Sequence, residues 1–423
     1  MITKYLALGK LKILPMAAVV LACIILALIA CSSNTPQIGE VSQVSAGYTH
    51  SLAVDNDGNL WAWGAGHNNQ LGLGRNGSSG ANESPQRIRS GASSWQLASA
   101  GHGYSLAIDS DGNLWTWGSG ITSEFDEHYQ VNPAVTAVTR PSTPEQVTTG
   151  AGLWQYVSAG RSHAIGIGAD GSLWTWGNGR NGELGLGETG SHSIPQQITN
   201  GATSWQSASA GRDHSLAIDS DGNLWAWGAG SDGQLGLGAA GQEDFARGAV
   251  NIDQHIPQQV TGGASSWRLA SAGHGYSLAI ASDGALWAWG NGSGNQLGLG
   301  RSGVSSNSPQ LVTGGADSWQ SVSAGRDLSV AIDTSGGLWI WGQVPNLQRN
   351  YSAPYQIVDG SNSWQSVSTG TNFFQSGIQE NRGQHTLIID SDGNLWAWGA
   401  GNFGQLGLGN RSWHDVPQQV SGR

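Results

Sequence analysis

Lysine is almost absent from this 423-residue sequence: Lys4, Lys10 and Lys12 are the only three, and all precede an apolar run from Ile13 to Ala30. Without a later lysine, the rest of the chain cannot form a Walker-type phosphate site or a lysine Schiff base. It carries 15 Arg against 29 acidic residues, a net charge of −14. Such a body lacks the positive charge that nucleic acid requires, so we expect no nucleic-acid partner.

Cysteine is equally scarce, and its two positions indicate membrane attachment. Cys23 lies inside the apolar run, and Cys31 directly follows it at the end of Leu-Ile-Ala-Cys. The basic start, the 18-residue apolar run and this ending resemble the lipobox of bacterial lipoproteins. That resemblance implies cleavage before Cys31 and lipidation of that residue. The alternative is an uncleaved single-span anchor, for which the run is just long enough.

These features divide the chain into three parts. We expect a signal peptide at 1–30, a lipidated tether at 31–40 and a folded domain at 41–423. With one cysteine left after cleavage, the mature chain can form no internal disulfide. We therefore expect a monomer held by its lipid at the bacterial cell envelope, and we favour the outer membrane or cell surface over the inner membrane.

A sevenfold repeat fills the predicted domain. The pattern L-W-x-W-G occurs seven times, each copy preceded by a Ser-Ala-Gly or Ser-Thr-Gly turn and followed by P-x-x-[IV]. The copies begin at Leu60, Leu114, Leu173, Leu224, Leu286, Leu338 and Leu395. Six copies add a Trp ahead of the Ser-Ala-Gly or Ser-Thr-Gly turn, and these positions hold 20 of the 21 tryptophans. Such regularity indicates that the repeated residues serve the packing of the fold and not a catalytic site.

Each repeat contains four short strand candidates and no helical periodicity. In H-S-L-A-I the His, Leu and Ile share one face, and in L-W-A-W-G the two Trp share a face opposite Leu and Ala. A broad aromatic face and a smaller opposite face let neighbouring sheets nest. We therefore predict an all-β fold, a seven-bladed β-propeller of four-stranded blades.

The ends of the chain carry a further prediction about ring closure. The first strand candidate is Val41–Gly47, and the chain ends just after Pro417–Val420. We expect the first unit to lack a strand that the last unit supplies, so that the ends meet in or beside one blade.

Two short motifs imitate ligand sites without completing them. Asp55, Asp109, Asp219 and Asp390 begin sequences that resemble the opening of a calcium loop, but glycine occupies the place of the bidentate acid. We interpret them as hairpin turns. G-x-G-x-x-G occurs four times, but never between a strand and a helix. We expect no metal and no cofactor.

A histidine recurs before Ser, Ala or Thr, at His50, His163, His214 and His385. Adjacent residues on one strand point to opposite faces, so a His-Ser neighbour pair cannot act as a catalytic pair. We interpret these histidines as hydrogen-bonded groups between blades, and we expect no catalytic residue.

The whole unit resembles the repeat of the regulator of chromosome condensation family, over about residues 41–420. The resemblance implies a seven-bladed propeller. The family's namesake is a guanine-nucleotide exchange factor for a small nuclear GTPase, and bacterial secreted relatives include propellers that inhibit β-lactamases. Neither activity is a property of the fold.

In the exchange factor, acidic and His side chains after the inner-strand glycine face the GTPase. The matching places hold Asp213 with His214 and Asp327 with Leu328, whereas Ser162 and Thr49 replace the acid before the other histidines. No long insertion matches the wedge of the exchange factor, and an exported protein would not meet a cytosolic GTPase. Exchange activity is therefore the third of three hypotheses.

The two residues after each Ser-Ala-Gly or Ser-Thr-Gly turn vary widely, although the strands around them barely change. We place the candidate binding face there, with Tyr48, His102, Arg161, Arg212, Asp213, His274, Arg326, Asp327, Phe373 and Phe374. The two phenylalanines could instead fold back and plug the mouth of the channel. The long connectors 119–143 and 239–256 are expected on the opposite rim.

The first functional hypothesis is a non-catalytic, membrane-tethered scaffold that binds a protein or a glycan at the envelope. The second is a secreted enzyme, or an enzyme inhibitor similar to the β-lactamase-inhibiting propellers. A cleft with perturbed ionisable groups would favour the enzyme, and a broad rim of mixed polarity would favour binding.

Overall fold

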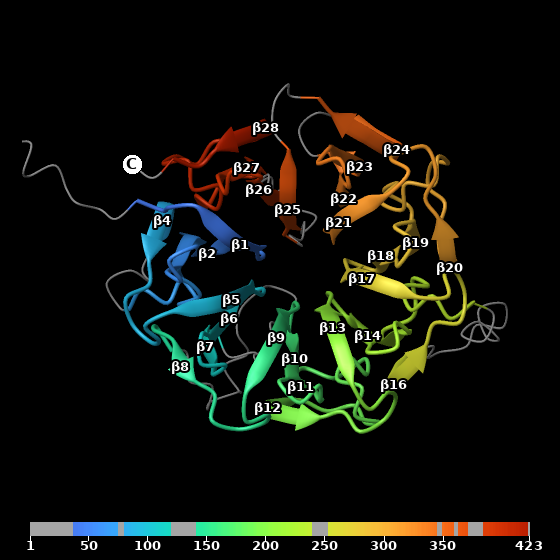
Figure 1. Ribbon diagram of the computed structural model, residues 1–423, viewed down its shortest axis with the longest axis horizontal. Coiled ribbons are helices and arrows are strands. Elements are labelled where there is room, and N and C mark those ends of the chain that lie inside the picture. Colours follow the sequence, from blue (N-terminus) through green and yellow to red (C-terminus); the bar gives the residue numbers. More distant parts are fainter. Residues whose placement is uncertain are drawn as a thin grey trace, which may run out of the picture. The chain divides into compact units, whose positions relative to one another are not determined.

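The computed structural model arranges the chain as seven four-stranded antiparallel sheets set around a ring (Figure 1). It describes residues 37–74, 80–119, 141–238, 253–344, 349–358, 363–370 and 384–421, and the structural statements below concern these residues. Their strands belong to one unit, Ile38–Arg423. Every sheet takes its strands from one continuous stretch, so each sequence repeat is one blade. The predicted seven-bladed, all-β propeller is confirmed.

The strand boundaries follow the repeat closely. Blades 1 and 2 contain β1 (Val41–Ala46), β2 (His50–Asp55), β3 (Leu60–Ala65), β4 (Ala81–Arg87), β5 (Trp95–Ala100), β6 (Tyr104–Asp109), β7 (Leu114–Gly118) and β8 (Glu145–Gln146). Blades 3 and 4 contain β9 (Trp154–Ala159), β10 (His163–Gly168), β11 (Leu173–Gly177), β12 (His192–Gln197), β13 (Trp205–Ala210), β14 (His214–Asp219), β15 (Leu224–Gly228) and β16 (Gln254–Gln259). Blades 5 and 6 contain β17 (Trp267–Ala272), β18 (Tyr276–Ala281), β19 (Leu286–Gly290), β20 (Ser306–Leu311), β21 (Trp319–Ala324), β22 (Leu328–Asp333), β23 (Leu338–Val344) and β24 (Arg349–Ile357). Blade 7 contains β25 (Trp364–Thr369), β26 (His385–Asp390), β27 (Leu395–Gly399) and β28 (His414–Gln419).

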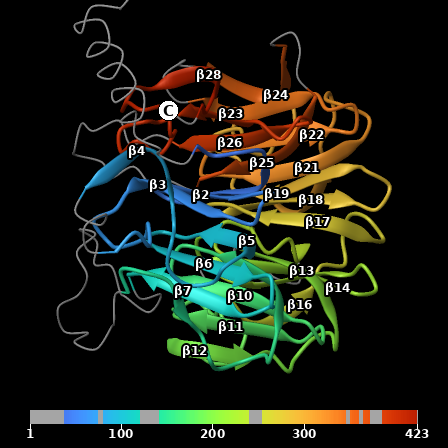
Figure 2. The ribbon, with the colours of Figure 1, turned by 60° about the vertical axis from the view of Figure 1, so that its left-hand side comes forward.

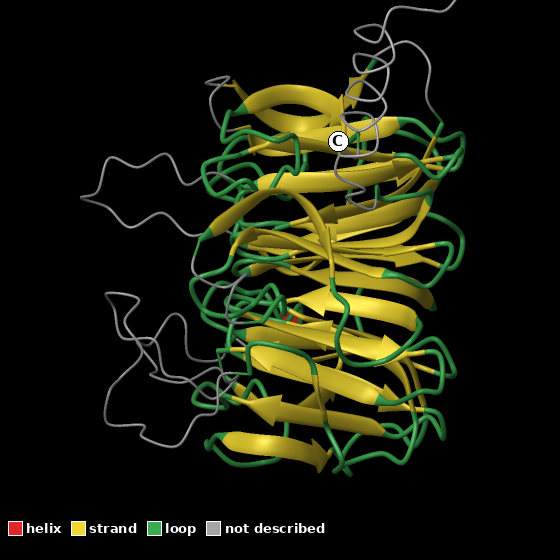
Figure 3. Ribbon diagram, turned by 90° about the vertical axis from the view of Figure 1, so that its left-hand side faces the viewer, coloured by secondary structure: helices red, strands yellow, loops and turns green. Residues whose placement is uncertain are grey.

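The strands run between two faces of the ring. The first strand of each blade lies nearest the middle and the fourth at the outer rim (Figure 1). The turns and loops gather at the two ends of the strands (Figure 3). Since the strands alternate in direction, the first-to-second turn and the third-to-fourth loop share one face, and the second-to-third hairpin turn lies on the other. Within the described ranges, we find no helix whose length and apolar character would let it span a membrane.

Neighbouring blades nest through two different faces, as predicted. Leu52 and Leu60 of blade 1 pack against Trp95 and Trp117 of blade 2. Trp95 meets Trp115 and Trp117 edge-on, at centroid distances of 5.7 and 6.4 Å. Such edge-to-face contacts add to the stabilisation from burying apolar area. The same alternation of a tryptophan face with a leucine face recurs around the ring.

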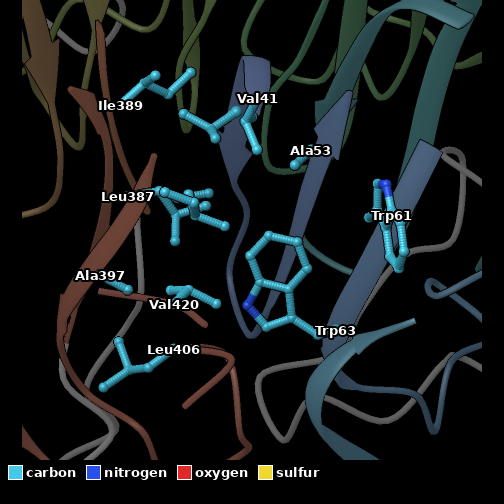
Figure 4. Packing of buried hydrophobic residues seen from close by; sticks show 12 residues of the cluster. Val41, Ala53, Trp61, Trp63, Leu387, Ile389, Ala397, Leu406 and Val420 are labelled. Carbon is cyan, nitrogen blue, oxygen red and sulfur yellow. The ribbon is translucent and has the colours of Figure 1, made fainter. Parts of the chain in front are cut away.

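Ring closure differs from the prediction. Blade 1 is complete by itself, because β1 to β4 all lie between Val41 and Arg87, so no strand is supplied by the last unit. The ends do meet beside one blade boundary: blades 1 and 7 lie side by side (Figure 2), and the Val41 N–H donates to the Gly393 carbonyl at 2.8 Å. Trp63 packs against Leu406 and Val420 across this boundary (Figure 4). The ring therefore closes by packing between complete blades.

An aspartate at the end of the second strand organises each hairpin turn that resembled a calcium loop. Asp109 Oδ1 accepts from the Asp111 and Asn113 N–H groups at 3.0 and 2.8 Å, and its Oδ2 accepts from Trp115 Nε1 at 2.9 Å. Both carboxylate oxygens thus accept hydrogen bonds from within the hairpin, from the turn and from the tryptophan of the next strand. This confirms the interpretation as a hairpin turn.

Blade 5 lacks this aspartate: Ala281 takes its place, and the buried Nε1 of Trp287 has no hydrogen-bond partner. We expect Ala281→Asp to raise the free energy of unfolding by about 1 kcal/mol, because a buried donor gains a charged acceptor. Urea denaturation measures the change. Asp219→Ala, the reverse substitution in blade 4, should lower the free energy of unfolding by about 2 kcal/mol. A loss of stability in Ala281→Asp would contradict this role of the aspartate.

Candidate functional site

The turns between first and second strands lie side by side at one end of the ring, in the six blades where the structure describes them. At four of the turns, the residue after the repeated glycine donates its N–H to the matching glycine carbonyl of the next blade: Tyr48 to Gly101 at 3.2 Å, Arg161 to Gly211 at 3.2 Å, Arg212 to Gly273 at 3.3 Å and His274 to Gly325 at 3.1 Å. We call the two residues after each glycine the turn ring. Its described members are Tyr48, Thr49, His102, Gly103, Arg161, Ser162, Arg212, Asp213, His274, Gly275, Arg326 and Asp327.

Packing explains why glycine is fixed while its neighbours vary. A Cβ atom on Gly101 would lie 2.4 Å from the Tyr104 ring, and one on Gly160 would lie 2.5 Å from the Gly211 carbonyl oxygen. The Tyr104 ring of the same blade and the turn of the next blade thus leave no room for a side chain at these two positions. The side chains that follow the glycine escape this constraint, so the turn ring can differ from blade to blade.

The loops after the third strands lie on the same face as the turn ring. Ser119 N–H donates to the Gly103 carbonyl at 2.8 Å, and Ala229 N–H donates to the Asp213 carbonyl at 2.8 Å. The first long connector begins at Ser119, on this face, and not on the opposite rim where it was expected. The second begins at Ala239, outside the described residues, so its position stays a prediction. The cause is strand parity: a loop that follows three strands returns to the face of the first turn. Residues 120–140 and 239–252 lie outside the described part of the chain.

Blades 3 to 6 bring charged side chains of the turn ring together. Asp213 has Arg212 Nε 3.2 Å from its Oδ2 and Arg161 Nη1 3.8 Å from its Oδ1. Arg212 Nη1 also contacts His274 Nε2 in the next blade. In blade 6, Arg326 Nε lies 3.1 Å from Asp327 Oδ2. These six predicted residues thus lie on four adjacent turns, and each of the three arginines lies beside a carboxylate.

The two histidines of the turn ring are neutral at physiological pH. Burial, followed by the charges of Arg161 and Arg212, lowers the pKa of His102 to about 3. Burial also lowers the pKa of His274 to about 3, with contributions from Arg212, Arg326 and Arg161. A neutral imidazole offers a lone pair to a guanidinium, which is what the contact between Arg212 and His274 requires. The Tyr48 ring stands edge-on to His102 at 4.0 Å.

Two further carboxyl groups near the turn ring were missed by the sequence analysis. Burial raises the pKa of Asp232, with Arg212 opposing this shift and Asp213 adding to it. Burial also raises the pKa of Glu183 to about 7, although its two oxygens accept from the Asn181 N–H and Nδ2, each at 2.8 Å. The sequence did contain a signal: Glu183 occupies a position that holds glutamine in blades 1, 4, 5 and 7.

The repeated histidines form a second set of contacts, deeper between the blades. His50 Nε2 lies 2.9 Å from Ser105 Oγ of the next blade, and Ser105 Oγ donates to the Gln70 carbonyl at 2.8 Å. The serine proton is therefore engaged, and the imidazole donates to the serine. His163, His214 and His385 repeat the contact with a neighbouring serine. The prediction of hydrogen-bonded histidines between blades is confirmed at Nε2.

Three predicted site residues cannot be placed. Phe373, Phe374 and Cys31 all lie outside the described residues. Among the residues that are described, no group of three or more His, Cys, Asp or Glu side chains could hold a metal ion.

Comparison with known proteins finds the same repeat elsewhere. The RCC1-like domain family model matches residues 30–316, and the RCC1 repeat model matches residues 392–423. The ultraviolet-B receptor UVR8 of Arabidopsis thaliana is 32% identical over 305 residues, which cover 71% of this chain and 64% of the receptor. The regulator of chromosome condensation of Mus musculus is 29% identical over 276 residues, 62% of each chain. This chain therefore spans less than two thirds of the length of either relative.

Two solved structures share the fold. Human WBSCR16 aligns with a TM-score of 0.68 at 20% identity and covers 86% of this chain and 93% of its own. Prp20p from Saccharomyces cerevisiae aligns with a TM-score of 0.66 at 20% identity, covering 78% of this chain and 80% of its own. At this identity the likeness shows the fold alone.

Proposed function

Because the chain belongs to the RCC1-like domain family, we propose that it is a non-catalytic binding propeller, tethered to a bacterial envelope membrane, whose turn ring holds a partner protein. The relatives support binding as the general role: UVR8 is a receptor, and Prp20p binds Gsp1p and histones. Those partners belong to those proteins. The partner of this chain has to be inferred from the residues of its own turn ring.

The main support for the proposal is that the packed residues of the blades repeat, whereas the residues of the turn ring differ from blade to blade. Glycines, tryptophans and the histidine–serine contacts repeat from blade to blade because packing requires them. The turn ring lies at one end of the same blades and differs from blade to blade. Tyr48, Thr49 and His102 are buried there, whereas blades 3 to 6 gather arginine, aspartate and histidine in four adjacent turns. Arginine and aromatic side chains on one face are typical of protein-binding surfaces.

Capture of the partner tests the proposal. We expect the variant Arg161→Gln, Arg212→Gln and Arg326→Gln to lose the partner that the wild-type chain retains after crosslinking in the native envelope. Its free energy of unfolding should change by no more than about 1 kcal/mol, because these ion pairs are partly exposed. The matched control is Arg87→Gln with Arg89→Gln, two exposed arginines at the end of an outer strand. Equal capture by both variants, or recovery of a glycan alone, would contradict the proposal.

The membrane tether is a separate part of the proposal and rests on the sequence around Cys31. We expect Cys31→Ser to abolish globomycin-sensitive processing and to move the protein out of the detergent phase, because the residue that carries the lipid is lost. Phase partitioning and electrophoretic mobility measure both effects. A Cys31→Ser protein that stayed with the membrane would indicate an uncleaved helix instead.

A further inference from the structure

The outer strand of blade 6 departs from the repeat at an exposed position. β24 lies at the outer edge of its sheet (Figure 1), and its Tyr355 lies opposite Ile340 of β23. The matching position holds Glu145 in blade 2 and glutamine in the other five blades, at Gln86, Gln196, Gln258, Gln310 and Gln418. Each of these glutamines donates from Nε2 to a carbonyl two residues earlier in its own strand. Blade 6 has an aromatic ring in place of this contact.

A bulge in β24 makes a second tyrosine the neighbour of the first. Tyr351 lies opposite Gly342, so residues four apart in β24 face residues two apart in β23. On a regular strand such residues lie about 13 Å apart, but here the two rings stack, with centroids 4.5 Å apart and planes at 14°. Blades 1, 3, 4, 5 and 7 have the same bulge, with Asn82, His192, Gln254, Ser306 and His414 at the position of Tyr351. None of these five blades forms a tyrosine pair.

The two tyrosines differ in their surroundings. Tyr351 is partly buried and packs against the apolar clusters between blades 5 and 6 and between blades 6 and 7. Tyr355 is 48% exposed, and since Tyr351 covers one side of its ring, the exposed surface belongs to the other side and the ring edge. Arg349 is exposed and donates from Nη1 to the Tyr351 hydroxyl at 3.3 Å, which places its guanidinium at the hydroxyl end of the stack. The result is a flat aromatic surface with hydrogen-bond donors beside it.

The chemistry of this surface favours a sugar ring. The face of an aromatic ring is negative and attracts C–H bonds, and a pyranose of the glucose configuration presents axial C–H bonds on both of its faces. The hydroxyl groups of such a sugar lie at the ring edge, where a guanidinium can donate to them. A neutral sugar is also not repelled by the part of the chain after Ala30, which carries 15 Arg and 29 acidic residues (15 − 29 = −14).

The edge of β24 is poorly suited to pairing with an extended peptide. Pro354 lies within the bulge and lacks the N–H that an added strand requires. The Ser352 carbonyl already accepts from the Gly300 N–H of blade 5 at 2.7 Å. A ligand at this edge therefore has to be held by side chains, and not by added β-pairing.

We propose that Tyr355, supported by Tyr351 and flanked by Arg349, binds a neutral glycan of β-linked glucose or N-acetylglucosamine. A pyranose ring would stack on the exposed side of Tyr355, and Arg349 would donate to its hydroxyl groups. This site lies on the outer strand of blade 6 and goes beyond the function proposed for the turn ring.

The probes are cellohexaose and chitohexaose, titrated separately into the full-length chain by isothermal titration calorimetry. The detergent is lauryldimethylamine oxide, which has no sugar headgroup to compete. We expect saturable binding of at least one probe, weakened by about tenfold or more in Tyr355→Gln, because a stacking contact is lost. This variant restores the residue of five other blades, so it should fold as the wild-type chain does. Tyr355→Phe keeps the ring and should bind nearly as well as the wild-type chain.

Gln310→Tyr, made in the Tyr355→Gln chain, is the matched control. It places a tyrosine at the same position of blade 5, where Ser306 takes the place of the supporting ring. We expect no recovery of binding. Recovery would contradict the role of the stacked pair.

Three further results would overturn the inference. They are the absence of binding by both sugars, equal binding by the wild-type chain and Tyr355→Gln, and Tyr355-dependent binding of an end-blocked decaproline peptide when neither sugar binds. The outcome is separable from the proposed function. The variant with Arg161, Arg212 and Arg326 changed to Gln should bind the sugar as the wild-type chain does, because those residues belong to the turn ring.

Discussion

Trp63→Ala should lower the free energy of unfolding by about 4 kcal/mol, the cost typical of a fully buried tryptophan. Trp63 has no exposed surface, packs against blade 7, and donates from Nε1 to the Gln405 carbonyl at 2.8 Å. The substitution therefore leaves a cavity at the boundary where the ends of the chain meet, and the Gln405 carbonyl keeps only the hydrogen bond from Ser51 Oγ at 2.8 Å. Denaturant unfolding followed by tryptophan fluorescence or circular dichroism measures the loss.

Trp413→Ala is the matched control for this prediction. Trp413 is the one tryptophan outside the repeat positions, and it is partly exposed. Its replacement should cost no more than about 1 kcal/mol, as is usual for residues outside a core. If the two alanine variants were equally stable, closure of the ring by packing between blades 7 and 1 would be wrong.

Glu183→Gln should stabilise the protein by about 2 kcal/mol at pH 8 and have little effect at pH 5. Burial raises the pKa of Glu183 from 4.5 to about 7, so the folded state holds the proton more tightly than the unfolded state. The stability that this group contributes is present below pH 4.5 and is lost as the pH rises towards 7. Glutamine is neutral throughout, so it removes this loss. It gives up one carboxylate contact with Asn181, which reduces the gain.

Blade 1 shows that glutamine fits this environment. Gln70 occupies the same position, and its Oε1 accepts from the Asn68 N–H at 2.8 Å, as Glu183 accepts from Asn181. The reverse substitution, Gln70→Glu, should introduce a loss of stability that grows between pH 5 and 8. Thermal unfolding across this pH range measures both variants. A wild-type stability that did not fall over that interval would contradict the raised pKa of Glu183.

Most of the strands and hairpin turns could be predicted from the sequence, because they depend on interactions between residues close together in the chain. Alternation along a strand placed Trp61 and Trp63 on one face and Leu60 on the other, and the structure packs them accordingly. The aspartate turns were readable for the same reason, since Asp109 binds groups within six residues of itself. The expected strand from the last unit was wrong, because blade 1 takes all four of its strands from Val41 to Arg87. The expected meeting of the two ends is confirmed.

The site could be predicted only in part. Each arginine of the turn ring was visible as an exception to the repeat, but the contacts that join one turn to the next connect residues a full blade apart in the sequence. The contact between Arg212 and His274 joins residues 62 positions apart, and only the angle between blades determines it. The first connector was expected on the wrong face, because a loop that follows a third strand returns to the face of the first turn. The role of Glu183 could not be predicted, because the change from glutamine to glutamate matters only when the side chain is buried and its pKa is raised.

The central claim is that the turn ring, and not the hairpin face, holds the partner. The most direct measurement is photocrosslinking in living cells with p-benzoylphenylalanine at Ser162, a partly exposed member of the turn ring. Leu153 is the control position, on the opposite face and 52% exposed. We predict a discrete crosslinked protein from position 162 that disappears when Arg161, Arg212 and Arg326 are changed to Gln, and none from position 153. A crosslinked protein from position 153 alone would contradict the claim.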